Sequence, residues 1–469
     1  MPHALVTGAN GFIGTHLVRH LLSRGYTVAG LVRSTSDVRG LAGLPLSLHV
    51  GDITQPETLD APMAGADVAF HLAASLMGLD EETFMRTNVD GTRNVLDAAR
   101  RQRGGRLTRF LYVSSQAAAG PAPGTTPIDE SRPCQPISWY GESKSRAESL
   151  VLEYGRDLPV TIVRPASVYG ERERDVAQVF PAVERRIQPI VGWRMKYLVM
   201  VDVEDLVRGF VDAAESANSV GKIYFLMHPQ ILTTRDVTRT VAQAMDRSAG
   251  VPLPVPIAAF TLAAPAAQFV TRFTRDRPAI TRDKAREVAQ RFWLADPSAS
   301  ARDFGWAAQH DLLAGMRRTT SAWRGEEATE RDMPLEPPAI RWVKYLCVAT
   351  LIGALIELQS YLAAFYTFTP WWLVFVVIVG AFGLGLGSVA MLLRRSTEIV
   401  QLAAGTAIAT AVEMLNVVAF HAWTFKPGWP FGITSPWIRS VVLGLAGGAF
   451  VLVVNAVMLS LYRLRLRKG

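Results

Sequence analysis

The sequence predicts an α/β protein with a doubly wound parallel sheet, followed by an all-α domain of four transmembrane helices. Strands and helices alternate up to about residue 165, and a glycine-rich loop joins the first strand to the first helix. Four long apolar stretches follow residue 340. Regular alternation is typical of a parallel sheet covered by helices on both faces, and apolar stretches of this length can cross a bilayer.

The first elements form a strand, a loop and a helix. Residues 3–7 read as a buried strand, about 12–24 as a helix and about 26–33 as the second strand. The glycines of the loop permit a tight turn and let backbone amides approach a pyrophosphate, which the helix N-terminus stabilises. This context predicts a dinucleotide site of the Rossmann type. We expect contacts from the whole loop: Gly8, Asn10, Gly11, Phe12, Ile13 and Gly14.

The end of the second strand predicts the cofactor. An acidic residue at this place would bind the ribose hydroxyls of NAD. The sequence has Leu31-Val-Arg33 instead, and an arginine suits a 2′-phosphate. NADP(H) is therefore favoured, with NAD(H) as the alternative.

Two further strand ends are expected near the point where the winding of the sheet reverses. Asp52 and Ile53 follow one strand, and Ala73 follows another. We expect them to line the cofactor; an ordinary turn and a packed loop of small residues are the alternatives.

Tyr140 and Lys144 are spaced to share one face of a helix. An ammonium near the phenol lowers the pKa of tyrosine, which makes the phenol a usable acid and base. Ser115 lies upstream, where a strand end runs into a small-residue loop, and its hydroxyl could hold a substrate oxygen. The alternative is a structural tyrosine with a solvated lysine. With the glycine loop in the same chain, we expect Ser115, Tyr140 and Lys144 to be catalytic.

Composition narrows the class of protein. The chain has 469 residues and a formal net charge of +8, but no run of basic residues appears in the first 330, which argues against a nucleic-acid partner. Its two cysteines cannot make a disulfide framework, and no metal-ligand spacing is present. The N-terminus lacks the pattern of a cleavable signal, so we expect the catalytic part to face the cytoplasm.

The C-terminal region predicts a multi-pass protein of the inner (cytoplasmic) membrane. Basic residues cluster on one side of a four-pass arrangement, which places both termini in the cytoplasm. A buried soluble helical domain is the alternative. The spans are expected at about 342–363, 371–393, 398–421 and 437–461.

We therefore expect three parts: a catalytic domain at 1–325, a charged, proline-rich linker at 326–339 and the membrane domain at 340–469. Within the first, nucleotide binding is expected at about 1–170 and a substrate region at about 171–325. The apolar stretch 251–275 suits the roof of an apolar substrate pocket, a segment on the membrane surface or an ordinary core helix.

Together these motifs resemble the extended short-chain dehydrogenase/reductase superfamily, also called the NAD-dependent epimerase/dehydratase group, over about residues 2–325. The resemblance places the active-site triad at Ser115, Tyr140 and Lys144, with the last two also contacting the cofactor. It implies cofactor contacts at the glycine loop, Asp52, Ala73, Pro165 and Val168. The segments 278–287 and 301–306 resemble the 3β-hydroxysteroid dehydrogenase and sterol C4-decarboxylase branch.

The resemblance implies a membrane-anchored oxidoreductase that interconverts a hydroxyl and a ketone on a sterol, triterpenoid or other lipid, with decarboxylation as a variant. Expected partners are a lipophilic small molecule and the lipid bilayer, with a homodimer or a pathway oxygenase as candidates. One alternative is a sugar-nucleotide or lipid-linked sugar epimerase or dehydratase. Leu198 stands where such enzymes carry a pyrophosphate-binding arginine, although Lys196 is near. The other alternative is a non-catalytic NADPH-binding subunit of a membrane complex.

Overall fold

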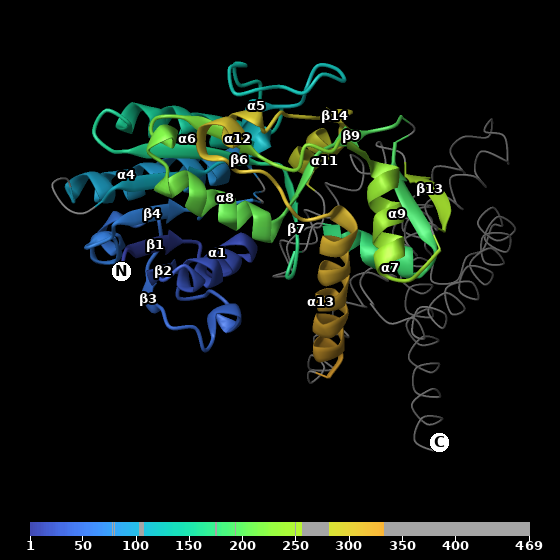
Figure 1. Cartoon of the computed structure of the whole chain (residues 1–469), viewed down its shortest axis with the longest axis horizontal. Coiled ribbons are helices and arrows are strands. Elements are labelled where there is room, and N and C mark those ends of the chain that lie inside the picture. Colours follow the sequence, from blue (N-terminus) through green and yellow to red (C-terminus); the bar gives the residue numbers. More distant parts are fainter. Residues whose placement is uncertain are drawn as a thin grey trace, which may run out of the picture. The chain divides into compact units, whose positions relative to one another are not determined.

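A parallel sheet of seven strands forms the centre of the computed structural model, with helices on both faces (Figure 1). The strand order is β11-β6-β5-β4-β1-β2-β3, and every neighbouring pair is parallel. The winding reverses between β1 and β4, so the loops that follow these two strands meet at one edge. The predicted doubly wound fold is confirmed. Its strands are β1 (His3–Thr7), β2 (Thr27–Val32), β3 (Ser47–Val50), β4 (Val68–His71), β5 (Arg109–Val113), β6 (Val160–Pro165) and β11 (Ile223–Leu226).

The structure describes residues 1–76, 78, 80–102, 107–173, 176–192, 194–248, 250–255 and 281–332. The chain divides into two units, Met1–Asp332 and Met333–Gly469. The four expected membrane spans all fall in the second unit, outside the described residues. Within the described ranges, no helix combines the length and the apolar character needed to cross a membrane.

The helices cover the sheet in two layers. On one face lie α1 (Phe12–Ser23) and α8 (Val203–Glu215); on the other lie α4 (Gly91–Arg101) and α6 (Trp139–Tyr154). Side chains alternate between the two faces along each strand. A central parallel strand buried on both faces is therefore expected to be apolar along its middle, as β1 is from Ala4 to Val6.

The packing of β1 shows this alternation. Ala4 and Val6 join the core cluster that contains Leu17 of α1, whereas Leu5, between them, joins the cluster that contains Val95 of α4. The helix expected at about 12–24 is observed at Phe12–Ser23.

The boundary expected at about residue 170 is not a boundary of the sheet. Helix α8 packs on α1, and β11 pairs with β6, so residues 203–226 complete the nucleotide-binding half. Sequence pattern alone could not show this, because the segment between β6 and α8 departs from the sheet before the chain returns to it.

Most of the remaining elements build a smaller second region (Figure 1), whereas the short helices α2, α3, α5 and α12 pack on the seven-stranded sheet or on the helices that cover it. Strand β7 pairs with β10, β9 lies between β12 and β14, and β8 pairs with β13. Helices α7, α9 and α13 share a third core cluster. The bounds are β7 (Ser167–Tyr169), β8 (Ile187–Val191), β9 (Tyr197–Leu198), β10 (Met200–Asp202), β12 (Leu232–Thr233), β13 (Val251–Val255), β14 (Phe292–Trp293), α2 (Asp60–Met63), α3 (Glu81–Phe84), α5 (Gln116–Ala119), α7 (Phe180–Glu184), α9 (Thr234–Ala244), α11 (Arg282–Ala289), α12 (Ser298–Phe304) and α13 (Leu312–Asp332).

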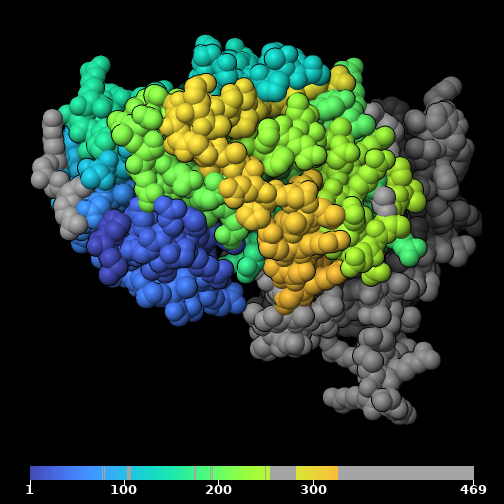
Figure 2. Space-filling view, viewed as in Figure 1, coloured from blue at the N-terminus to red at the C-terminus, as the bar shows by residue number. Residues whose placement is uncertain are grey.

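The last described segment, residues 281–332, packs on earlier parts of the first unit. Figure 2 shows its yellow and orange atoms beside the green atoms of the preceding segments. The indole of Trp306 donates to the carbonyl of Asp205 at 3.0 Å, and Arg318 pairs with Asp202 at 2.7 Å. Both contacts join this segment to the start of α8.

The apolar stretch 251–275 begins as a strand, so the core-helix interpretation is wrong for Val251–Val255. The amide of Val251 donates to Arg186 at 2.8 Å. Pro252 and Pro254 have no backbone N–H. They alternate with the residues whose backbone groups point towards β8, so the missing donors fit an edge strand. Residues 256–280 lie outside the described residues.

Helix α13 runs to Asp332 and so includes residues 326–332, the first part of the expected linker. Glutamate, alanine and arginine dominate this stretch, and all three favour helix despite their charge. The prolines on which the linker prediction rests begin only at Pro334.

Candidate active site

The glycine loop forms a tight turn at the switch point of the sheet. Gly8 has a φ of 72°, in the left-handed region, and a Cβ there would stand 3.0 Å from the amide nitrogen of Ala73. Gly14 backs onto Gly8, since an added Cβ would meet the Gly8 carbonyl and stand 3.0 Å from the Cα of Ala9. Glycine therefore serves the turn at one position and close packing at the other. Gly8 and Ala73, both predicted cofactor residues, are brought together.

The N-terminus of α1 is open towards this loop. Gly11 is the N-cap and supplies no side chain to the first amides, and the first turn has no acidic residue. Phe12 and Ile13 therefore begin a helix whose unpaired amides and dipole favour an anion. The predicted residues of the loop, with Asn10, lie at one helix N-terminus.

The adenosine side of the predicted site lies at the ends of β2 and β3. Arg33 follows β2 directly and is exposed. The amide of Gly51 donates to the Val32 carbonyl at 2.9 Å, which places Asp52 beside the end of β2. Asp52 therefore follows a strand that lies two positions away from β1 in the sheet. From the sequence we expect it near the switch point, and the structure does not place it there. The edge position of β3 explains the difference.

Asp52 and Ile53 differ in what they present. The Asp52 carboxylate accepts hydrogen bonds from the amide and hydroxyl of Thr54, at 2.9 and 2.8 Å. The Ile53 side chain is buried in the core against Gly91, and its carbonyl accepts from Asn94. Of these two residues, Asp52 is the one with a half-buried polar side chain.

Ser115 lies directly beyond β5. Its hydroxyl caps the short helix α5 by accepting the amide of Ala117 at 3.1 Å. The small-residue loop expected here is thus partly helical, because a serine N-cap followed by alanines favours a helical turn.

Helix α6 carries the other two catalytic candidates. Tyr140 is half-buried and packs beside Phe84, with ring centroids 6.2 Å apart. Lys144, one turn later, is buried; its Nζ donates to the Val113 carbonyl at 2.8 Å and lies 4.8 Å above the ring of Tyr112. The lysine thus anchors α6 to the strand end that precedes Ser115.

The environment of Lys144 makes its charge costly. Burial lowers the pKa of Lys144 from 10.5 to about 7, while Glu148, four residues on, acts in the opposite direction. A strongly shifted pKa next to a candidate acid and base is typical of functional sites. Glu148 is itself held in a buried ion pair with Arg164 of β6, at 2.6 Å.

Two predicted contacts lie on the neighbouring strands. Pro165 is the last residue of β6 and is buried, and Val168 is half-buried in the centre of β7. Pro165 and Val168 therefore lie on the same side of the sheet as Ser115, at the carboxyl ends of the strands, because neighbouring parallel strands end together.

Comparison with known proteins places this geometry in a family. Residues 4–226 match the model of the NAD dependent epimerase/dehydratase family. A 3-beta-hydroxysteroid dehydrogenase from Mycolicibacterium neoaurum is 33% identical over 265 residues, which cover 53% of this chain and 71% of that protein. The chain belongs to the NAD-dependent epimerase/dehydratase family. It is an NAD(P)-dependent enzyme of the extended short-chain dehydrogenase/reductase type.

Two further proteins are similar to this chain in sequence or in structure. The 4-hydroxy-2-methyl-3-oxo-4-farnesyl-3,4-dihydroquinoline-1-oxide ketoreductase of Stigmatella aurantiaca is 35% identical over 229 residues, or 47% of this chain and 66% of that protein. The crystal structure of gox2253 has a TM-score of 0.58 and 28% identity, covering 70% of this chain and 99% of that chain. The residues of the glycine loop fit the cofactor of the family, because Gly8, Gly11 and Gly14 leave the backbone free of side chains at the N-terminus of α1.

Asn88 joins α6 to the loop after β4, a link that the sequence pattern does not predict. It is buried, exchanges hydrogen bonds with the backbone of Ser75, and donates to the Ser143 hydroxyl at 2.9 Å. Ser143 in turn donates to the carbonyl of Tyr140 at 2.8 Å. An isolated asparagine carries no pattern that would have revealed this link.

Helix α11 holds the start of α6, which the sequence analysis also missed. Asp283 accepts the amides of Trp139 and Tyr140 at 2.7 and 3.2 Å. The Ser138 hydroxyl, which caps α6, donates to Glu287 at 2.7 Å. In the sequence, the segment 278–287 shows only a family resemblance. Its contact with Tyr140 comes from tertiary structure.

Proposed function

We propose that this protein is a membrane-anchored oxidoreductase that prefers NADP(H) and interconverts a hydroxyl and a ketone on a sterol, triterpenoid or other lipid. The observation that carries the chemistry is the burial of Lys144 between α6, which bears Tyr140, and the end of β5, beyond which Ser115 lies. A bound nicotinamide supplies or accepts the hydride.

Each residue of the triad has one task. Tyr140 gives its phenolic proton to the ketone oxygen in reduction and takes it back from the hydroxyl in oxidation. Ser115 donates a hydrogen bond to the same oxygen, while its own oxygen accepts the Ala117 amide. Lys144 in its charged form favours the phenolate, because an opposite charge nearby lowers the pKa of tyrosine.

The lipophilic substrate class rests on the relatives. The relative from Mycolicibacterium neoaurum is named for a steroid, and that from Stigmatella aurantiaca for a farnesylated compound. A substrate with a carboxylate beside the carbinol carbon would become a β-keto acid, which loses carbon dioxide readily. Decarboxylating oxidation is therefore a variant of the same proposal.

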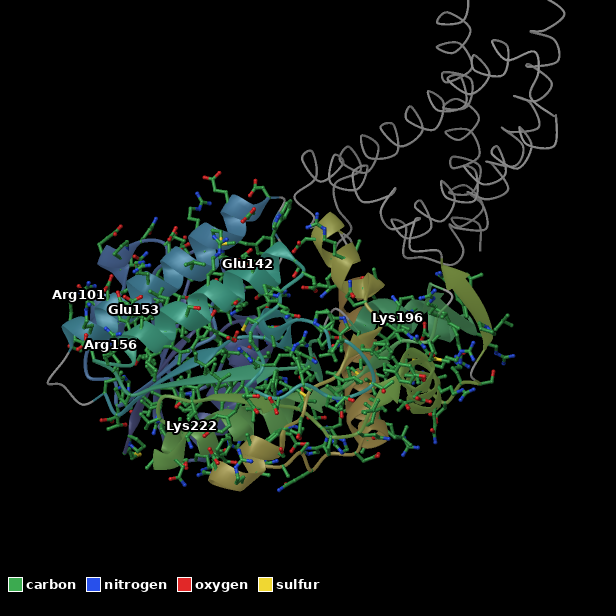
Figure 3. The ribbon with its side chains drawn as sticks, turned by 90° about the horizontal axis from the view of Figure 1, so that it is seen from above. Arg101, Glu142, Glu153, Arg156, Lys196 and Lys222 are labelled. Atoms are coloured by element: carbon green, nitrogen blue, oxygen red, sulfur yellow. The ribbon has the colours of Figure 1, made fainter. Side chains whose placement is uncertain are left out.

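The position of Lys196 counts against a sugar-nucleotide substrate. Lys196 was the residue available to replace the missing pyrophosphate-binding arginine at Leu198. Its ammonium is buried and donates to the Val288 carbonyl, at the end of α11. It lies apart from Glu142 of α6 in Figure 3. The lysine is thus engaged with backbone in the second region.

Membrane anchoring rests on the sequence of residues 340–469. The four apolar stretches and their basic flanks support a multi-pass unit of the cytoplasmic membrane, with the catalytic part on the cytoplasmic side. A bilayer would also be the source of the lipophilic substrate.

The test compares lipid extracts of a strain lacking the gene with those of the wild type and of a strain carrying Tyr140→Phe. An accumulated keto-lipid, hydroxy-lipid or carboxy-lipid in both mutant strains is the expected result. A changed glycolipid with unchanged neutral lipids would favour the epimerase or dehydratase alternative.

A further inference from the structure

The side chain of Arg172 crosses from the loop after β7 to the loop after β2. Its guanidinium occupies the place that a Cβ at Gly40 would take, with Nη2 2.8 Å from that point. The φ of Gly40 is not positive. Glycine is therefore needed at position 40 for the room it leaves to the arginine, and not for its backbone freedom.

The backbone of Arg172 is itself unusual. Its φ is 71°, in the left-handed region, which only Arg172, Arg186 and Asp246 adopt among the described non-glycine residues. Such conformations are unfavourable for residues with a Cβ, and they persist at functional sites. The conformation directs this side chain towards the β2 loop.

Contacts with α1 hold the loop that bears Arg172. The Nε2 atom of His16 lies 3.0 Å from the Glu171 carbonyl, and Arg19 lies 3.9 Å from the Glu171 carboxylate. A Cβ at Gly170 would stand 3.6 Å from the ring of Phe12, the first residue of α1. The loop therefore sits on the helix whose N-terminus faces the expected pyrophosphate, and Arg172 reaches from there to Gly40 in the loop after β2.

Positive charge gathers in the β2 loop. Arg39 is bound by Asp37 through contacts of 2.8 to 3.1 Å, so these two charges offset each other. Arg39, and more weakly Arg172, hold the pKa of Asp37 well below its usual range. Arg33 and Arg172 supply further positive charge to one short loop, an arrangement that an anion would stabilise.

We propose that Arg172 is a second arginine for the 2′-phosphate of the cofactor and acts together with Arg33. In this fold the residue that ends β2 contacts the adenosine ribose, and Arg172 reaches the loop that begins there. The inference rests on the NADP(H) preference in the proposed function. It adds a specificity-determining residue that lies 132 positions after Gly40 in the chain. The position of its guanidinium depends on the space that this glycine leaves.

The test measures binding of 2′,5′-ADP and 5′-AMP to the full-length protein by calorimetry, so that catalysis and lipid substrate play no part. Arg172→Ala should weaken 2′,5′-ADP roughly tenfold or more, the scale of a lost charge-assisted hydrogen bond, and leave 5′-AMP within about twofold. Gly40→Ala should weaken 2′,5′-ADP in the same way, because the new methyl takes the slot while the flexible arginine can move aside.

Two matched variants serve as controls. Arg156→Ala removes an exposed arginine after α6, and Gly124→Ala adds a methyl where no atom lies within 4 Å; neither should change the ratio of the two affinities. A wild type that binds both nucleotides equally would overturn the NADP(H) preference and this inference together. A wild-type preference that survives in Arg172→Ala, or an equal loss for both nucleotides, would overturn the inference alone.

Discussion

The carboxylate of Asp283 accepts the backbone amide of Tyr140 at 3.2 Å, although the two residues are 143 positions apart in the chain. The contact lies at the N-terminus of α6, where a negative charge is favourable and the first amides lack partners within the helix. Helix α11 thereby fixes the start of α6.

Removing this contact should impair turnover more than stability. Asp283→Ala is expected to lower kcat by roughly 10- to 100-fold, because a small displacement of a reacting group is costly, while nucleotide affinity stays within about twofold. Asp236→Ala is the control, since Asp236 caps α9 in a similar way but lies in another helix. An equal fall in kcat for both variants at equal thermal midpoints would contradict a role in positioning Tyr140.

Tyr140→Phe should remove most turnover and leave cofactor binding near normal, because only the transferable proton is lost. A fall of about 10²–10⁴ in rate is the usual scale for general acid–base catalysis. Tyr154→Phe is the matched control: Tyr154 lies on the same helix, and its hydroxyl donates to Asp97 at 2.7 Å. Turnover of purified Tyr140→Phe close to that of Tyr154→Phe would refute the mechanism.

The lowered pKa of Lys144 predicts a pH dependence of stability. Between about 7 and 10.5, the unfolded chain holds a proton that the folded protein has lost, so this group makes the free energy of unfolding rise with pH across that window. Lys144→Met lacks the group. In calorimetric scans without cofactor, the thermal midpoint of the wild type should therefore rise relative to that of the variant between pH 7 and pH 9. A constant difference across this range would show that the lysine titrates elsewhere.

Arg33 should control cofactor preference. Wild type is expected to bind NADPH more tightly than NADH, and Arg33→Asp should reverse the order, with a loss for NADPH of about 1.5–3 kcal/mol from the missing charge-assisted contact. Titrations that follow cofactor fluorescence measure both affinities. Arg156→Asp, an equal charge change at an exposed arginine after α6, should leave the order intact. Equal affinities in the wild type would refute the prediction.

The membrane topology can be tested with reporter fusions. We expect four spans with both termini in the cytoplasm, since the arginine and lysine clusters fall on one side. A reporter fused after Gly469 should be active only if it is of a kind that functions in the cytoplasm. A reporter inserted after Pro427 should be active only if it is of a kind that functions in the periplasm. A periplasmic signal from the C-terminal fusion would show that the topology is wrong.

Features that depend on short segments of chain could be predicted from the sequence. The strand, glycine loop and helix at residues 3–24 were predictable because φ-permissive glycines, apolar periodicity and an open helix N-terminus are local properties. The spacing of Tyr140 and Lys144 was readable for the same reason, since neighbours on a helix face follow from helix geometry.

The distant residues that complete the candidate site could be identified only in the folded protein. Nothing in the local sequence places Asp283 against Tyr140, Arg172 over Gly40, or Lys196 on the Val288 carbonyl. The burial that lowers the pKa of Lys144 likewise requires β5 to lie beneath α6. These contacts form between segments that come together only when the chain folds, and their distances and desolvation depend on packing of the whole domain.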